Sequence, residues 1–164
     1  MRGSMRPLLP LVLALALAAP ALAQQDQPVS TRILLAGNSC TAAADAGGGP
    51  QGVIDTCNKA ITDIQTIKAA STLNPHETNL YNVMLSLAHT TIGSKMGAID
   101  GARTSRVCGE LETSWGFLSK LIPGNSPPDY ASDMYALQQR AVPAVKVCRS
   151  EFPAPAGAPR LPPE

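Results

Sequence analysis

The sequence predicts an all-α fold in which four main antiparallel helices follow a cleaved signal peptide. Apolar residues recur every three or four positions through most of residues 51–152, which is the spacing of one face of a helix. Two of these segments begin with a capping residue and a proline, as helices often do. All four cysteines lie after the signal, where they predict disulfides between the helices.

Residues 1–23 have the pattern of an export signal. Two arginines precede an apolar run over residues 8–19, and residues 21–23 (Ala-Leu-Ala) offer a small-x-small cleavage site before Gln24. The run is too short to span a bilayer and a polar stretch follows it, so we expect cleavage and no stable membrane anchor. The mature chain is predicted to be periplasmic or secreted, and periplasmic if this Ala-rich signal belongs to a Gram-negative bacterium.

Residues 24–50 are predicted to form a short leading segment that ends in a glycine-rich loop. Three consecutive glycines followed by Pro50 interrupt the periodic pattern, so a loop is expected there. Residues 33–46 fit one short helix that contains Cys40, although their apolar pattern is too brief to distinguish a helix from a strand. The helical domain is therefore expected over residues 51–152.

The first two main helices are predicted over residues 51–71 and from Pro75 onward. The first has an apolar face at helical spacing, formed by Val53, Ile54, Cys57, Ala60, Ile61, Ile64 and Ile67. The second begins with a capping box, since Asn74 can cap it and Glu77 can return a hydrogen bond. Its apolar face is formed by Leu80, Val83, Met84, Leu87, Ala88 and Ile92.

Gly93, Gly97 and Gly101 recur every fourth residue after that face. Such a series either loosens a helix or lets another backbone approach closely, because glycine has no side chain and costs about 1 kcal/mol against alanine in a helix. We expect the second helix to break near Gly97 or Gly101.

The third and fourth helices are predicted over residues 103–121 and from Ser126 to about Phe152. The inward face of the third consists of Val107, Cys108, Leu111, Trp115, Leu118 and Ile122. The inward face of the fourth consists of Tyr130, Met134, Leu137, Ala141, Val145, Cys148 and Phe152. Residues 153–164 contain five prolines and are predicted to be a disordered or extended tail.

The cysteines predict two disulfides, for which one pairing is favoured. The third and fourth helices are joined by a short loop and should lie antiparallel, which places Cys108 at the start of one near Cys148 at the end of the other. By elimination Cys40 pairs with Cys57. The other pairings and free buried thiols stay open as alternatives. A metal site or a redox-active pair is not favoured, because the chain has no CxxC spacing.

The sequence shows few candidates for chemistry, and we expect no enzyme, no metal and no cofactor. His76 follows a helix cap, where exposed polar residues are common, and His89 could act as a base only if a nucleophile approached it. Glu110 and Glu112 are two residues apart on a helix, so their side chains point in different directions, and both are expected to be solvated charges. The chain contains no nucleophile elbow, phosphate loop or zinc motif.

Composition excludes nucleic acid as an expected partner. The whole chain has 13 Lys and Arg against 12 Asp and Glu, and loss of Arg2 and Arg6 with the signal leaves it close to neutral. No segment gathers basic residues into a stripe, and aromatic residues that could stack on bases are scarce.

Residues 53–61 (Val-Ile-Asp-Thr-Cys-Asn-Lys-Ala-Ile) resemble the second helix of a tetratricopeptide repeat. In that family a small or aliphatic residue, a bulky one and an alanine face the partner helix, and Val53, Cys57 and Ala60 match them. The chain departs from the pattern at Gln65, where the family has a proline. A second, weaker register has Ser86, Ala98 and Ala102 at the small positions. The resemblance implies a helical scaffold that binds peptides or proteins, and it transfers no binding residues.

We therefore expect a small, non-catalytic, exported helical scaffold or protein-interaction module of the cell envelope. Its expected partner is another envelope protein or peptide. One alternative is a helical small-molecule carrier with a pocket near Trp115, to which Phe117, Tyr130 and Tyr135 could contribute. A second alternative is an enzyme of unrecognised type.

Overall fold

A computed structural model of the chain describes residues 27–101, 103–125 and 131–162, without the side chains of residues 131–135. All regular secondary structure in these ranges is helical, in the order α2 (Val29–Asp45), α3 (Pro50–Ala69), α4 (Pro75–Asp100), α5 (Ser105–Leu118) and α6 (Ala131–Glu151). The predicted signal peptide and the predicted start of the last helix, at residues 126–130, lie outside the described residues. None of the described helices is long and apolar enough to cross a membrane.

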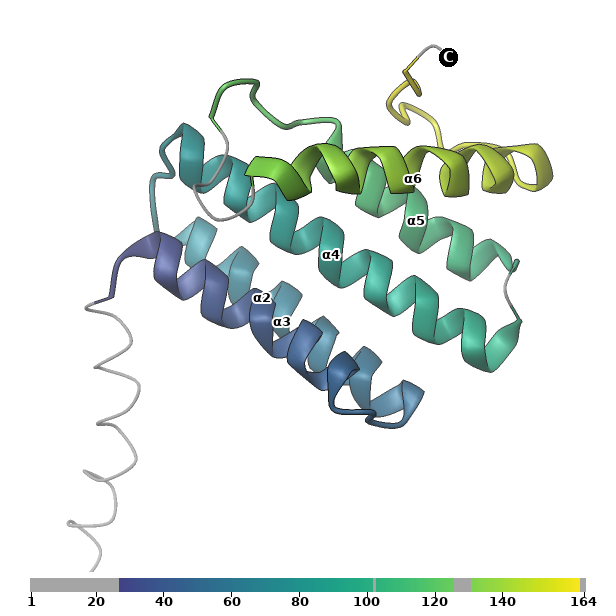
Figure 1. Cartoon of the computed structure of the whole chain (residues 1–164), viewed down its shortest axis with the longest axis horizontal. Coiled ribbons are helices and arrows are strands. Elements are labelled where there is room, and N and C mark those ends of the chain that lie inside the picture. The colour runs from purple at the N-terminus through teal and green to yellow at the C-terminus, as the bar shows by residue number, and fades with distance from the viewer. Residues whose placement is uncertain (1–26, 102, 126–130, 163–164) are drawn as a thin grey trace, which may run out of the picture.

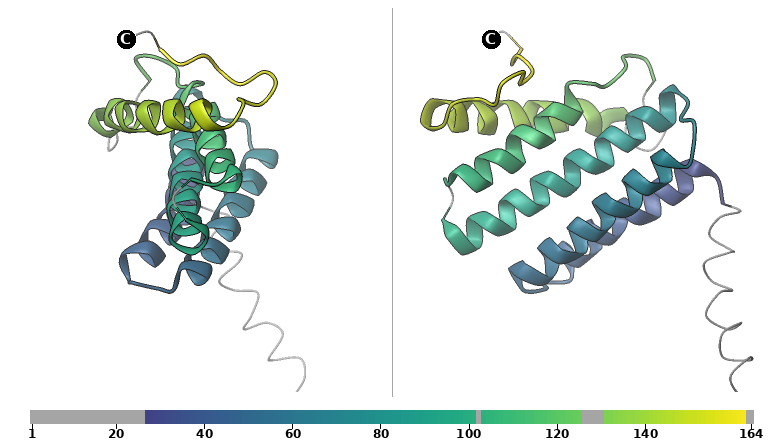
Figure 2. Two further views of the ribbon diagram at one scale, coloured as in Figure 1. Left: turned by 90° about the vertical axis from the view of Figure 1, so that its right-hand side faces the viewer. Right: turned by 180° about the vertical axis from the view of Figure 1, so that it is seen from behind.

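Successive helices run in opposite directions and form an antiparallel array (Figure 1). Helices α2, α3 and α4 pack against one another, α5 packs on α4, and α6 packs on α5. The two further views show α6 lying across one edge of the array, away from the α2–α3 pair (Figure 2). The all-α prediction is confirmed, because the regular secondary structure of the described residues is helical. Helices α5 and α6 share an interface at that edge.

The leading segment is a full helix, so the predicted number of four main helices is too low. Helix α2 has 17 residues and buries Ile33, Gly37 and Cys40 against its neighbours. At Gly37 an added Cβ would overlap the side chain of Met84 in α4, so the missing side chain is what permits this close packing. Small buried residues such as Gly37 differ little in hydrophobicity from exposed ones, which explains why the apolar pattern of residues 33–46 is too brief to identify the helix from the sequence.

Helix α4 begins and ends at the signals that the sequence predicted. The backbone N–H of Glu77 donates to Asn74 Oδ1 at 2.9 Å, and the backbone N–H of Asn74 donates to Glu77 Oε2 at 2.9 Å. The helix continues through Gly97 and ends before Gly101, whose φ of 96° is in the left-handed region. A Cβ at Gly93 would lie 3.3 Å from that of Glu110, so this glycine brings α4 and α5 close together.

Two disulfides tie neighbouring helices in the pairing that the sequence favoured. Cys40 bonds to Cys57 between α2 and α3, and Cys108 bonds to Cys148 between α5 and α6. The buried core consists of two clusters between α2, α3 and α4 and a third, formed by Trp115, Leu118 and Val145, between α5 and α6. The second disulfide therefore fixes the same helix pair that the third cluster joins.

Candidate functional site

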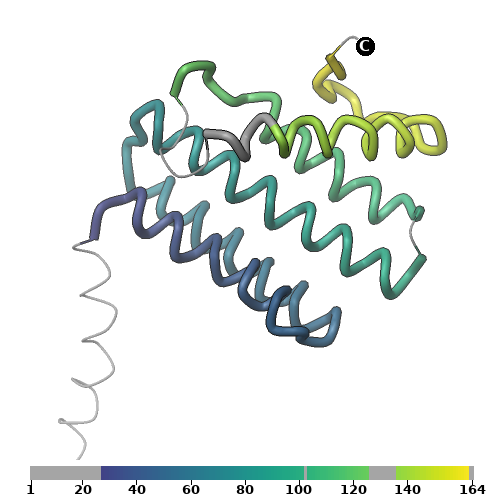
Figure 3. Tube along the Cα trace, in the orientation of Figure 1, coloured from purple at the N-terminus to yellow at the C-terminus, as the bar shows by residue number. Residues whose placement is uncertain are grey.

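The C-terminal segment, which the sequence predicted to be a disordered or extended tail, packs on the α5–α6 edge. Residues 153–162 turn back along α6, as the chain trace shows (Figure 3). The turn is closed by the backbone N–H of Ala158, which donates to the Pro155 carbonyl at 3.0 Å, and Gly157 adopts a φ of 79° within it. Residues 153–162 form no helix or strand, and Leu161 docks on the core that α5 and α6 already form.

The Pro159 carbonyl is the polar contact point of this docked segment. It accepts a hydrogen bond from Trp115 Nε1 at 3.3 Å and another from Arg149 Nη2 at 2.9 Å. Trp115 is only 4% exposed, and a buried indole N–H needs an acceptor. Two residues further on, Leu161 packs against the core cluster that contains Trp115.

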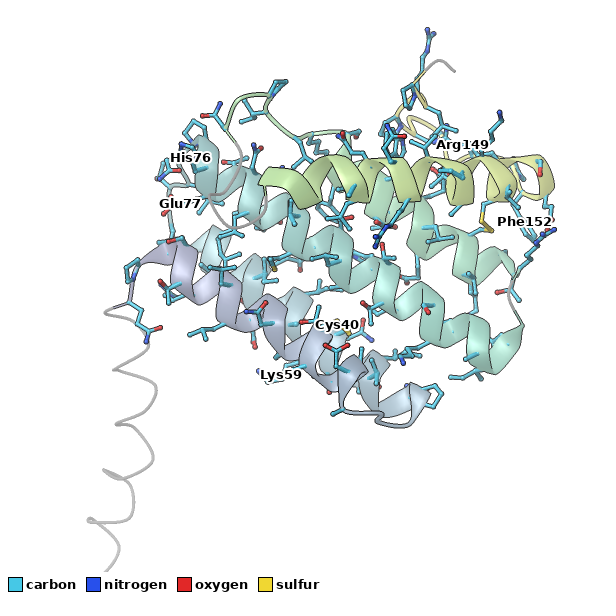
Figure 4. The ribbon with its side chains drawn as sticks, in the orientation of Figure 1. Cys40, Lys59, His76, Glu77, Arg149 and Phe152 are labelled. Atoms are coloured by element: carbon cyan, nitrogen blue, oxygen red, sulfur yellow. A yellow bond between two sulfur atoms is a disulfide. The ribbon has the colours of Figure 1, made fainter. Side chains whose placement is uncertain are left out.

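Arg149 is oriented toward the tail by Glu112, which corrects the prediction that Glu112 is a solvated charge. Glu112 is 9% exposed and accepts from Arg149 Nε at 2.7 Å and Nη2 at 2.8 Å. The hydrogen bonds and charge of Glu112 raise the pKa of Arg149 above its ordinary value, against an opposing effect of burial. Arg149, labelled in Figure 4, therefore stays protonated and presents a fixed donor.

The residues that α5 contributes to this edge lie on one face of the helix. Cys108, Glu112, Trp115 and Ser119 follow one another at spacings of four, three and four residues, which aligns their side chains along the helix. Cys108 carries the disulfide to α6, and the next two residues of the face bind Arg149 and Pro159. The same face therefore joins α5 both to α6 and to the tail.

Two open hollows flank the docked segment. The larger, of about 390 Å³, is lined by Trp115, Ser119, Gln138, Gln139 and Val142 of the helical part and by Arg160, Leu161 and Pro162 of the tail. The smaller, of about 230 Å³, is lined by Gly109, Glu112 and Thr113 and by residues 155–159. The tail therefore lies on this edge without filling it.

The polar cluster around His89 joins α4 to α5 at a different place. His89 Nδ1 lies 2.7 Å from Glu110 Oε2, and its ring stacks on Phe117 with centroids 5.7 Å apart. Glu110 and Glu112 thus point in different directions, as predicted, toward α4 and α6. Nearby, the hydroxyl of the buried Ser114 lies within hydrogen-bond distance of the Ser86 and Thr90 hydroxyls. Neither hollow includes His89, and these contacts serve helix packing.

Phe117 does not line the predicted aromatic pocket near Trp115. Its ring lies edge-on to Tyr81 with centroids 6.3 Å apart and faces His89, so it points toward α4. Tyr130 and the side chain of Tyr135, the other expected contributors, lie outside the described part of the chain.

The remaining sequence candidates do not gather into a metal centre. His76 is exposed at the start of α4, next to the capping box, as Figure 4 shows. All four cysteines are in disulfides. Within residues 27–101, 103–125 and 131–162, no three His, Cys, Asp or Glu side chains come together in a way that could bind a metal ion.

Fold and site together define a disulfide-bonded, all-helical protein that carries a docked proline-rich segment at one edge. Comparisons with protein-family models, with curated proteins and with solved structures found no match. The resemblance to tetratricopeptide repeats therefore stays a prediction.

Proposed function

We propose that this protein is a small, non-catalytic, exported interaction module that binds an extended segment of another envelope protein across α5 and α6. The observation that carries the proposal is the docking of the tail through the Pro159 carbonyl and Leu161. Every peptide has main-chain carbonyls, so donors aimed at one recognise an extended chain with few demands on its sequence. The two disulfides fit the oxidising compartment that this proposal requires.

Preorganisation of the donors supports a binding role for this edge. Trp115 is buried in the core, and Arg149 is fixed by two hydrogen bonds to Glu112. Cys148 immediately precedes Arg149, so the disulfide to Cys108 fixes the backbone beside the second donor. Donors that are already ordered lose little entropy when a ligand arrives, which favours affinity.

Site-directed photo-crosslinking tests the proposal. A benzophenone amino acid replaces Gln139, an exposed residue that lines the larger hollow, in the mature chain. The matched control carries it at Lys59, an exposed residue on α3 that is labelled in Figure 4. In envelope extract, a protein crosslinked from position 139 and not from 59 is expected. No crosslink, or the same products from both positions, would contradict the proposal.

One observation favours a small-molecule carrier as the alternative. The hollow of about 390 Å³ beside Trp115 is comparable in size to ligand sites, which occupy roughly 300–1,000 Å³. A carrier predicts that an apolar dye such as anilinonaphthalene sulfonate shifts Trp115 fluorescence in a saturable way. The interaction module predicts no saturable shift with the dye, because the hollow is open and the tail forms part of its wall.

A further inference from the structure

We infer that the ligand of the α5–α6 edge is a proline-rich segment with a Pro-x-Leu core, and that Pro159 to Leu161 occupy its place in the free protein. The inference rests on the proposed function and names the chemistry of the partner. The tail is then a competing intramolecular ligand, which an external segment displaces.

The burial pattern of the tail shows which of its positions the helices contact. Ala158, Pro159 and Leu161 are half-buried, whereas Arg160 is exposed. Pro159 supplies a carbonyl to Trp115 and Arg149, and Leu161 places an apolar side chain on the core. Arg160, between them, borders the larger hollow.

Proline suits position 159 for two physical reasons. It has no backbone N–H, so its partial burial leaves no donor without a partner. Its ring also fixes φ near the value of an extended polyproline helix, which lowers the entropy that an unbound segment loses on binding. A proline-rich partner would therefore bind more readily than a flexible one with the same contacts.

The two hollows indicate that the tail fills the binding site on the α5–α6 edge only in part. Three consecutive small residues of the tail, Ala156, Gly157 and Ala158, border the smaller hollow, and none of them is large enough to fill it. A larger apolar side chain at the position of Ala158 would cover Gly109 and Thr113 and remove more apolar surface from water. An external segment with such a residue should bind more tightly than the tail sequence itself.

The tail nevertheless competes strongly because it is tethered to α6. Pro159 lies only ten residues after Arg149, so its local concentration at the site is on the order of millimolar. An external peptide of equal intrinsic affinity must displace it. Weakening the tail should therefore raise the apparent affinity for external peptides.

Fluorescence anisotropy with labelled peptides tests this inference on the full mature chain, residues 24–164. The protein is used as wild type and as Leu161→Asp, which removes the apolar contact of the tail and leaves α5, α6 and both disulfides in place. Three peptides are compared: residues 153–164, the same peptide with Ala158→Leu, and the same peptide with Leu161→Asp. Circular dichroism confirms that the variant protein retains its helices.

We expect the unmodified peptide to bind the Leu161→Asp protein about tenfold more tightly than the wild type. The Ala158→Leu peptide should bind more tightly still, and the Leu161→Asp peptide at least tenfold more weakly. Equal binding of the unmodified and Leu161→Asp peptides, or binding of neither, would overturn the inference. If crosslinking from position 139 still captures a protein, the interaction function stands and only the Pro-x-Leu assignment fails.

Discussion

Glu112 and Arg149 form a two-point ion pair between α5 and α6, with Nε–Oε1 and Nη2–Oε2 distances of 2.7 and 2.8 Å. Arg149 Nη2 also donates to the Pro159 carbonyl, so the charge that joins the two helices is the one that binds the tail. The packing of α5 on α6 and the geometry of the candidate site therefore depend on the same guanidinium.

Removal of Glu112 should destabilise the protein more than loss of an exposed ion pair. Glu112→Ala leaves Arg149, whose side chain is 20% exposed, without its carboxylate. We expect a loss of about 2 kcal/mol in the free energy of unfolding, a figure that already allows for solvent screening of this partly exposed guanidinium. The control is Lys59→Ala, which breaks the exposed pair with Asp63 and should cost less than about 0.5 kcal/mol. Urea unfolding measures both, and equal losses would contradict the assigned role of Glu112.

The disulfide between α5 and α6 should contribute more stability than the one between α2 and α3. It closes a loop with a sequence separation of 40 residues, against 17 for the other. The chain-entropy treatment assigns these loops about 4 and about 3 kcal/mol. We expect Cys108→Ser/Cys148→Ser to lower the urea midpoint more than Cys40→Ser/Cys57→Ser under non-reducing conditions. The reverse order would show that strain or packing outweighs loop entropy.

Asn79 should be more costly to replace than Asn74, the residue that caps the start of α4. Its buried side chain donates to the carbonyls of Ile122 and Asn125 and accepts from the Ile122 N–H, which fixes the loop after α5. Asn79→Ala leaves these groups without partners, at about 2–3 kcal/mol. Asn74→Ala removes an exposed cap, at about 1 kcal/mol. Thermal unfolding that ranks Asn74 above Asn79 would refute this.

Tyr81 should make stability depend on pH in the alkaline range. Burial raises its pKa above the ordinary value of 10.0, so folding favours the neutral phenol. Its contribution is fully present below the unfolded pKa and is lost as the pH rises through the folded one. We expect the free energy of unfolding to fall more steeply above pH 10 in the wild type than in Tyr81→Phe, which keeps a ring beneath Lys68. Parallel pH profiles would argue against this assignment.

Local signals made much of the fold predictable from the sequence. The capping box at Asn74 and the break at Gly101 depend on residues close together in the chain, and both are present. The Cys108–Cys148 pair followed from the antiparallel order of two helices. Helix α2 was underestimated because Gly37 and Cys40 pack by being small, and a hydrophobic pattern does not register such contacts.

The candidate site was harder to predict from the sequence than the fold, because its contacts join distant parts of the chain. Once Cys108 and Cys148 are paired, Glu112 one turn later and Arg149 one residue later are expected to be neighbours, so that ion pair had a signal in the sequence. The docking of Pro159 had none. Its partner Trp115 is 44 residues away, and only the assembled α5–α6 edge creates the surface that the tail contacts.

The most direct test of peptide binding at this edge uses the single tryptophan of the chain. Its indole N–H gives one nuclear magnetic resonance signal, which reports the hydrogen bond of Trp115 to the Pro159 carbonyl. We predict that Leu161→Asp moves this signal as the tail leaves, and that a peptide of residues 153–164 returns it to the wild-type position. A signal that moves in the variant but does not respond to the peptide would contradict the account, because the tail would then be only a structural part of the fold.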